Sequence, residues 1–284
     1  MGNESMTTRI FVTGGASGLG REIALRWART GARVCIGDLN DERGQGVAAE
    51  IAKMGGSALY RRCDVTKTED LQAVADLLQR EWGGVDIVVN NAGVATAGEL
   101  SGETIEQWQW ILNINLLGVV RGCQVFAPLF KAQGSGRFVN IASMAGLVHP
   151  PAMGSYNASK AAVVALSETL HLELAHDGIG VTVVCPSFFR TNLNESLRSS
   201  DPNAAVVMEK LFRKARITAP EIADRIFDAV RANRFLVLPH ADDRKAYLMK
   251  CYAPVRTYLN IMAKMTRGFR SSRARTARTA EPAR

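Results

Sequence analysis

The sequence lacks the residue spacings that mark metal sites, disulfide frameworks and membrane spans. Its five cysteines form no CxxC pair, and its four histidines show no ligand spacing such as HExxH. We therefore expect reduced cysteines that pack in the core, and no metal site. No run approaches about eighteen apolar residues, and residues 1–8 are polar where a signal peptide needs an apolar segment. These absences favour a cytoplasmic protein.

Excess positive charge is confined to the C-terminal part of the chain. Eleven of the 35 lysines and arginines, but only three of the 27 aspartates and glutamates, lie from His240 onward. The first 239 residues therefore carry 24 charges of each sign, and the net charge of +8 belongs to residues 240–284. The tail contains no known nucleic-acid reader motif. We expect a small-molecule ligand and no nucleic-acid partner.

Short apolar runs alternate with helical patterns along most of the 284 residues, a length that suits one large α/β domain or two small ones. The runs predict strands at residues 9–13, 33–37, 57–62, 86–89, 136–141, 180–185 and 234–238. Helices are expected at 19–29, 41–54, 103–112, 115–132, 155–176 and 221–232. Asn40 or Asp41 would cap the helix at 41–54, and Thr66 or Thr68 would cap one more helix. Continuous apolar strands between helices indicate the α/β class, with a parallel sheet covered on both faces.

A glycine-rich loop, TGGASGLG at residues 13–20, follows the first strand and opens the first helix. Glycine allows positive φ and a close approach of the backbone to a pyrophosphate at a helix N-terminus. Asp38 ends the second strand, where a carboxylate can accept hydrogen bonds from both adenosine ribose hydroxyls. The same carboxylate repels a 2′-phosphate, and the loop has no basic side chain. The sequence therefore favours NAD over NADP.

Tyr156 and Lys160 stand four residues apart at the head of an expected helix, so their side chains lie on one face. A positive charge close to a phenol favours phenolate and lowers the pKa of the tyrosine. Tyr156 would then be a usable acid or base near neutral pH. An isolated YxxxK pair is more often a helix start with a solvated lysine, so the other motifs decide between the two interpretations.

These motifs occur together in an order that resembles the short-chain dehydrogenase/reductase family. The chain also has Asp64-Val65, NNAG at residues 90–93, Asn115 in a long helix, and Ser143 thirteen residues before Tyr156. The resemblance covers roughly residues 9–238. It implies a single doubly wound Rossmann-type domain with a parallel sheet of about seven strands, which usually assembles as a homodimer or homotetramer. The catalytic domain is then residues 1–240, and residues 241–284 form a basic, helical extension that we expect to be disordered at its end.

The resemblance implies catalytic roles for four matching residues. Tyr156 would exchange a proton with the substrate oxygen, and Ser143 would hydrogen-bond that oxygen. Lys160 would bind the nicotinamide ribose and lower the pKa of the tyrosine. Asn115 would hold a water in a proton relay to Lys160.

The resemblance also implies the cofactor site. Ser187 stands after Pro186 where the family usually has glycine, so a small change in the nicotinamide pocket is expected. The expected cofactor contacts come from the glycine loop, the adenine-flanking pair, the NNAG segment, the catalytic pair and the end of the sixth strand: Gly14, Ser17, Gly18, Leu19, Gly20, Asp38, Asp64, Val65, Asn91, Ala92, Gly93, Tyr156, Lys160, Pro186 and Thr191.

The segments after the fifth and sixth strands, residues 144–153 and 188–212, are expected to build the substrate side. They are rich in apolar side chains, which fits a steroid, retinoid or long-chain alcohol or ketone better than a sugar or an acidic metabolite. The candidate substrate contacts are Ser143, Met153, Tyr156, Phe188 and Phe189. We predict hydride transfer between NAD(H) and a secondary alcohol or ketone. The alternatives are an NADP-dependent reductase of 3-oxoacyl or other carbonyl substrates, and a non-catalytic binding or regulatory protein of this fold.

Apolar residues of the tail recur at spacings of three and four, which is the pattern of a helix stripe. Pro254 would kink this helix or start a second one as its first residue. The helix would dock on the body or on a partner subunit, or it would lie on an anionic membrane surface and bring the enzyme to a lipophilic substrate. The stripe consists of Leu248, Cys251, Val255, Tyr258, Met262 and Met265.

Overall fold

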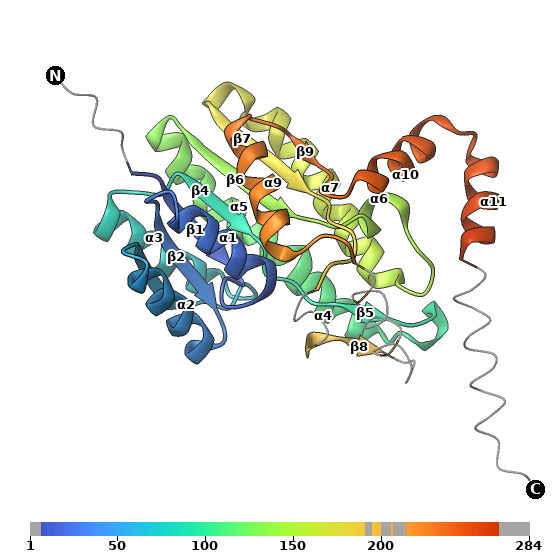
Figure 1. The fold of residues 1–284 in the computed structure, drawn as a ribbon, viewed down its shortest axis with the longest axis horizontal. Helices are drawn as coiled ribbons and strands as arrows, with labels where there is room; N and C mark the ends of the chain where they lie inside the picture. The colour runs from blue at the N-terminus through green and yellow to red at the C-terminus, as the bar shows by residue number, and fades with distance from the viewer. Residues whose placement is uncertain (1–6, 191–194, 200–205, 207–212, 214, 267–284) are drawn as a thin grey trace, which may run out of the picture.

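The computed structural model describes residues 7–190, 195–199, 206, 213 and 215–266 (Figure 1). A parallel sheet of seven strands forms its centre, in the order β3-β2-β1-β4-β6-β7-β9. The strand order reverses between β1 and β4, so the domain is doubly wound, as predicted. The strands are β1 (Arg9–Thr13), β2 (Arg33–Asp38), β3 (Ser57–Arg62), β4 (Ile87–Asn90), β6 (Gly136–Ile141), β7 (Ile179–Val184) and β9 (Leu236–Val237).

Helices cover both faces of the sheet because side chains along each strand point alternately to the two faces. Ile10 and Val12 pack with α1 (Gly18–Ala28), α2 (Asp41–Lys53) and α9 (Ala219–Arg231). Phe11 points the other way and belongs to a second core that includes residues of three other helices. These helices are α3 (Thr68–Trp82), α5 (Leu117–Gln133) and α7 (Gly154–Leu174). Four of the five cysteines, all except Cys251, are buried as free thiols, in agreement with their expected packing role.

The predicted cap of α3 was wrong. Lys67 precedes the first helical residue and makes no side-chain capping hydrogen bond. Thr66 instead donates its hydroxyl to Asp64 over 2.7 Å, because a short polar side chain can bond locally in a turn as readily as at a helix end. The cap of α2 is the predicted one, since Asn40 accepts a hydrogen bond from the backbone of Arg43.

Asn115 ends α4 (Ile105–Asn115), whereas the sequence placed it at the start of the next helix. Leu116 separates α4 from α5 with φ −107° and ψ −61°. By length and hydropathy alone, the stretch Ile105–Gln133 could cross a membrane, but 39% of its apolar window is buried inside the fold. Because α5 packs on β4 and β6 as core helices do, the hydropathy of this stretch is only weak support for a membrane-spanning helix.

Several short elements were not predicted because two or three residues are too few for a periodic pattern. The strands β5 (Thr96–Ala97) and β8 (Arg198–Ser199) pair in parallel as a small second sheet. One turn of helix, α6 (Ala145–Val148), follows Ser143 directly. The 3₁₀ turn η1 (Leu100–Gly102) is another short element, and the 3₁₀ turn η2 (Ala175–Asp177) overlaps the end of the helix predicted at 155–176.

The tail forms two helices, α10 (Ala241–Tyr252) and α11 (Val255–Met265), of which α10 lies beside α6 (Figure 1). Pro254 starts the second helix as its cap, one position before the one predicted. The residues of the predicted stripe do not form one buried face. Within α11, Tyr258 is buried, whereas Val255 and Met265 are 73% and 69% exposed. Residues 267–284, with the end that we expected to be disordered, lie outside the described residues.

Candidate active site

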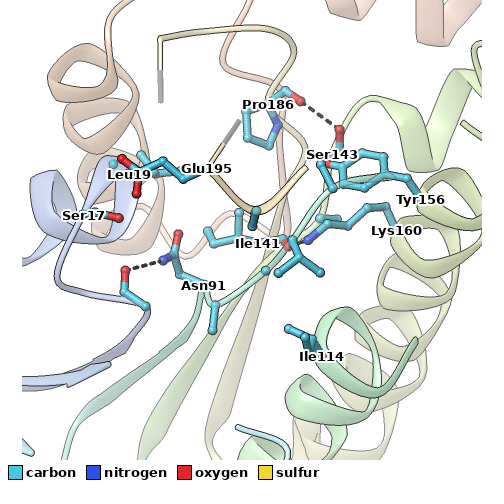
Figure 2. A pocket seen from close by; sticks show the side chains of 18 of the residues that line it. Ser17, Leu19, Asn91, Ile114, Ile141, Ser143, Tyr156, Lys160, Pro186 and Glu195 are labelled. Atoms are coloured by element: carbon cyan, nitrogen blue, oxygen red, sulfur yellow. Dashed lines mark hydrogen bonds between the residues drawn. The ribbon is translucent and has the colours of Figure 1, made fainter. Parts of the chain in front are cut away.

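A cavity of about 730 Å³ opens at the carboxyl ends of the central strands. The glycine loop and Asp38 line one end, and Met153 and Tyr156, which pack in one cluster, line the other. Figure 2 shows Ser17 and Leu19 at the first end and Ser143, Tyr156 and Lys160 at the second. Most of the predicted site residues line this cavity: Gly14, Ser17, Gly18, Leu19, Asp38, Asp64, Val65, Asn91, Ala92, Gly93, Ser143, Met153, Tyr156, Lys160, Pro186, Phe188 and Phe189.

The glycine loop lies tightly against the NNAG segment. Gly14 has φ +63°, and a Cβ atom on it would lie 2.9 Å from the Cα of Ala92. The Asn91 side chain donates to the carbonyls of Thr13 and Gly14 at 2.9 and 3.1 Å. Gly20 is not among the cavity-lining residues; a Cβ there would lie 2.2 Å from the Gly14 carbonyl oxygen. The loop therefore offers bare backbone at the N-terminus of α1, which fits a pyrophosphate.

Asp38 is fixed at the wall of the cavity. Its two carboxylate oxygens accept backbone hydrogen bonds from Ala16 and Asn40, each 3.0 Å long. Burial raises the pKa of Asp64, but hydrogen bonds from Thr66 outweigh this effect and leave the pKa below its usual range. Both carboxylates are thus held by local hydrogen bonds at the adenosine end.

An ion pair at this end was not foreseen. Arg43 of α2 lines the cavity and pairs with Glu195 at 2.7 Å. The two residues are 152 positions apart, and neither belongs to a motif, so no local pattern could have paired them. The pairing balances the charge of Arg43, which lines the cavity at the same end as Asp38.

Ser143, Tyr156 and Lys160 meet at the other end of the cavity (Figure 2). The Ser143 hydroxyl accepts a hydrogen bond from the Ala145 backbone at 3.1 Å and donates to the carbonyl of Pro186 at 3.4 Å. Lys160 donates to the carbonyl of Ile141 at 2.9 Å. A serine hydroxyl, a phenol and an ammonium are thus held together over the ends of β6 and α7.

Burial dominates the titration of the catalytic pair. It raises the pKa of Tyr156, and the hydrogen bond with Ser143 offsets only part of the rise. It lowers the pKa of Lys160 to about 8. The expectation that Lys160 lowers the pKa of Tyr156 was wrong for this geometry. The ammonium lies 5.9 Å from the centre of the phenol ring and is directed at the Ile141 carbonyl, while the buried phenolate would lose its hydration.

Asn115 is fully buried behind this group and does not line the cavity. Its side chain accepts from the backbone N–H of Val94 at 2.8 Å and donates to the Val94 carbonyl at 2.9 Å. A Cβ on Gly93 would lie 3.2 Å from the Asn115 side-chain oxygen and 3.5 Å from the Lys160 nitrogen. Asn115 therefore fixes the segment between β4 and β5 beside Lys160. Because α4 ends at Asn115, the last carbonyl groups of this helix have no partners within the helix.

The substrate end is mainly apolar. Met153 is buried beside Tyr156, and Val148, Pro150 and Ile114 also line the cavity. Thr191 and much of the predicted segment 188–212 lie outside the described residues. In the part of the chain that is described, no group of three or more His, Cys, Asp or Glu side chains could share a metal ion.

Comparisons with known proteins agree with this geometry. The family model for short chain dehydrogenases matches residues 8–202. A crystal structure of a short chain dehydrogenase/reductase from Burkholderia phymatum, in complex with NAD, superimposes with a TM-score of 0.82. The two chains are 30% identical, and the alignment covers 86% of this chain and 92% of the other. The protein belongs to the short-chain dehydrogenase/reductase family of oxidoreductases.

Two curated relatives are similar to this chain over most of its length. The 3beta-hydroxysteroid dehydrogenase 1 of Eggerthella lenta is 35% identical over 214 residues, which are 75% of this chain and 82% of the relative. The probable oxidoreductase EphD of Mycobacterium tuberculosis (strain ATCC 25618 / H37Rv) is 36% identical over 236 residues, or 80% of this chain. The match covers only 40% of the length of EphD.

Proposed function

We propose that the protein transfers a hydride between NAD(H) and a secondary alcohol or ketone. The observation that carries this proposal is the convergence of Ser143, Tyr156 and Lys160 at one end of a cavity that has a glycine loop and Asp38 at its other end. A dinucleotide fits the residues present, because bare glycine backbone and a helix N-terminus suit its pyrophosphate. Asp38 suits its ribose hydroxyls.

In this proposal the chain's own residues handle the proton. The nicotinamide, when bound, supplies the acceptor or donor of the hydride. Ser143 would hydrogen-bond the substrate oxygen, and Tyr156 would accept its proton during oxidation. Lys160 would bind the ribose, and Asn115 would fix the relay beside it. The positive charge of oxidised nicotinamide would favour phenolate and counter the effect of burial on Tyr156.

The preference for NAD rests on Asp38 and on the Arg43–Glu195 pair. A carboxylate at this position repels a 2′-phosphate, and Arg43 is already engaged by Glu195. The alternative is an NADP-dependent reductase of 3-oxoacyl or other carbonyl substrates, which would require Arg43 to leave Glu195 and bind that phosphate.

The substrate class rests on the apolar wall formed by Val148, Pro150 and Met153. An alcohol or ketone of steroid, retinoid or long-chain type matches this wall, and the hydroxysteroid dehydrogenase among the relatives supports the steroid option. A non-catalytic binding or regulatory role is the other alternative. Such a role has no need of all four residues Asn115, Ser143, Tyr156 and Lys160.

A spectrophotometric assay tests the proposal. The purified protein is incubated with NAD or NADP and a panel of secondary alcohols, and with NADH or NADPH and the matching ketones. We expect turnover with NAD(H), fastest for apolar ring or long-chain substrates. Absence of turnover across the panel would favour the non-catalytic alternative, and faster turnover with NADP(H) would contradict the cofactor assignment.

We also propose assembly as a homodimer or homotetramer, and peripheral membrane contact through the tail of a cytoplasmic protein. Tyr252, Val255 and Leu259 are 83%, 73% and 56% exposed, and the tail carries the net positive charge. An exposed apolar helix face with basic residues suits an anionic lipid surface. Leu259→Asp should weaken sedimentation with phosphatidylserine vesicles, whereas equal sedimentation would contradict membrane contact.

Light scattering gives the oligomeric state, and a monomer would contradict the proposed assembly as a homodimer or homotetramer.

A further inference from the structure

The C-terminal helices bind the end of α6, far from them in sequence (Figure 1). Lys250 of α10 donates to the carbonyl of Leu147, and its nitrogen lies 3.1 Å from Nδ1 of His149. The Tyr258 hydroxyl of α11 donates to the carbonyl of Val148 over 2.7 Å. A helix end leaves its last carbonyls without intrahelical partners. The tail thus supplies the missing donors to two successive carbonyls.

The segment that follows α6 is also held from outside. His149 and Ala152 have φ of 50° and 60°, a conformation that is uncommon for residues other than glycine, although histidine adopts it more often than alanine does. The carbonyl of Pro150 accepts from the Asn157 side chain at 2.7 Å, and that of Ala152 accepts from the backbone of Gly98 at 2.9 Å. Because the local backbone is unfavourable, its shape depends on these outside donors.

This same segment is the wall of the substrate end of the cavity. Val148, Pro150 and Met153 line the cavity, and Tyr156 follows them at the start of α7. Val148 contributes a side chain to the wall and a carbonyl to Tyr258. A shift of its backbone therefore moves the wall relative to Tyr156.

We propose that Lys250 and Tyr258 are positioning residues that set the shape of the substrate wall, so that the C-terminal helices determine which alcohols or ketones are accepted. The inference rests on the proposed hydride transfer but concerns only the substrate end of the cavity. Tyr258 is 7% exposed, and burial raises its pKa, so it remains a protonated donor. A bulky tetracyclic substrate would touch the wall, whereas a small alcohol would reach Ser143 and Tyr156 without touching it.

Steady-state kinetics of Tyr258→Phe and Lys250→Met test this inference, with a tetracyclic 3-hydroxysteroid and cyclohexanol as probes. Tyr252→Phe and Lys245→Met are matched controls, because Tyr252 and the Lys245 side chain are 83% and 85% exposed. Loss of one such hydrogen bond should raise the KM for the steroid roughly threefold to tenfold. The KM for NAD, the kcat and the kinetics with cyclohexanol should stay at wild-type values, and Lys250→Arg should restore the steroid KM.

Hydrogen exchange of residues 145–153 provides a readout that is independent of activity. Tyr258→Phe should accelerate this exchange roughly threefold to tenfold, and Tyr252→Phe should leave it unchanged. Wild-type exchange rates in Tyr258→Phe would overturn the inference. Equal changes in KM for the steroid and cyclohexanol would also overturn it. A wild-type protein that oxidises neither probe would contradict the proposed function, while the exchange would still decide whether the tail holds the wall.

Discussion

The ammonium of Lys160 lies 5.9 Å from the centre of the Tyr156 ring and donates its hydrogen bond to the Ile141 carbonyl. The two side chains share one end of the cavity, yet the lysine is committed to the backbone of β6. Burial therefore governs both groups: it raises the pKa of the tyrosine and lowers that of the lysine.

The buried ammonium of Lys160 should make the protein less stable at neutral pH than a variant without it. Its pKa falls from 10.5 to about 8, so below pH 8 the folded state bears the full cost of burying a charge. Between pH 8 and 10.5 the unfolded state binds more protons than the folded state, and stability rises with pH. The shift corresponds to about 3 kcal/mol at most.

Lys160→Met should therefore raise the midpoint of thermal unfolding at pH 7 by a few degrees, and the gain should shrink as the pH rises from 8 to 10. Calorimetry across this range measures the effect. Lys245→Met is the control, because the Lys245 side chain is 85% exposed. A gain that is independent of pH, or a loss of stability at pH 7, would show that the ammonium is not buried as described.

Asp38→Asn should reduce the preference for NADH over NADPH. The substitution removes the negative charge that repels a 2′-phosphate and leaves Arg43 at the same end of the cavity. Loss of a charged hydrogen-bond acceptor should weaken NADH binding about tenfold to a hundredfold. Fluorescence titration with both reduced cofactors measures the change. Unchanged NADH affinity would mean that Asp38 does not contact the ribose.

Gly20→Ala should disrupt the glycine loop although Gly20 is not among the cavity-lining residues. The added Cβ would lie 2.2 Å from the Gly14 carbonyl and 2.5 Å from the Asn91 side chain. Such a clash forces the backbone to shift, and overpacking of this kind typically costs about 1–3 kcal/mol. Gly46→Ala, with no atom within 4 Å of the new Cβ, is the matched control. Equal melting temperatures and equal NADH affinities in the two variants would contradict the packing described.

Ser143→Ala should lower kcat by about a hundredfold to a thousandfold, because it removes the hydroxyl that we propose hydrogen-bonds the reacting oxygen. The Ser143 side chain has no expected contact with the adenosine end, so NADH affinity should stay within experimental error. Ser143→Thr keeps the hydroxyl and should recover part of the activity. A kcat that falls equally in both variants would point to lost packing and not to a lost hydrogen bond.

Local patterns predicted the central sheet and most of the residues that line the cavity, because apolar runs and loop motifs are encoded by neighbours in sequence. The third strand, β3, has the predicted bounds, Ser57–Arg62. The Arg43–Glu195 pair and the bond from Tyr258 to Val148 join positions 152 and 110 residues apart, which no periodic signal could reveal. The Lys160 ammonium points to the carbonyl of Ile141 in β6, a contact that the YxxxK spacing does not predict. The effect of burial on the pKa of Tyr156 likewise depends on the folded chain and not on this spacing.

Turnover of Tyr156→Phe, together with its affinity for NADH, is the most direct test of the catalytic assignment. The substitution removes only the hydroxyl that would exchange a proton with the substrate. We predict that kcat falls by about a hundredfold to ten-thousandfold on the best secondary alcohol of the panel. NADH should bind with wild-type affinity in a fluorescence titration. Wild-type turnover in this variant would contradict hydride transfer assisted by Tyr156.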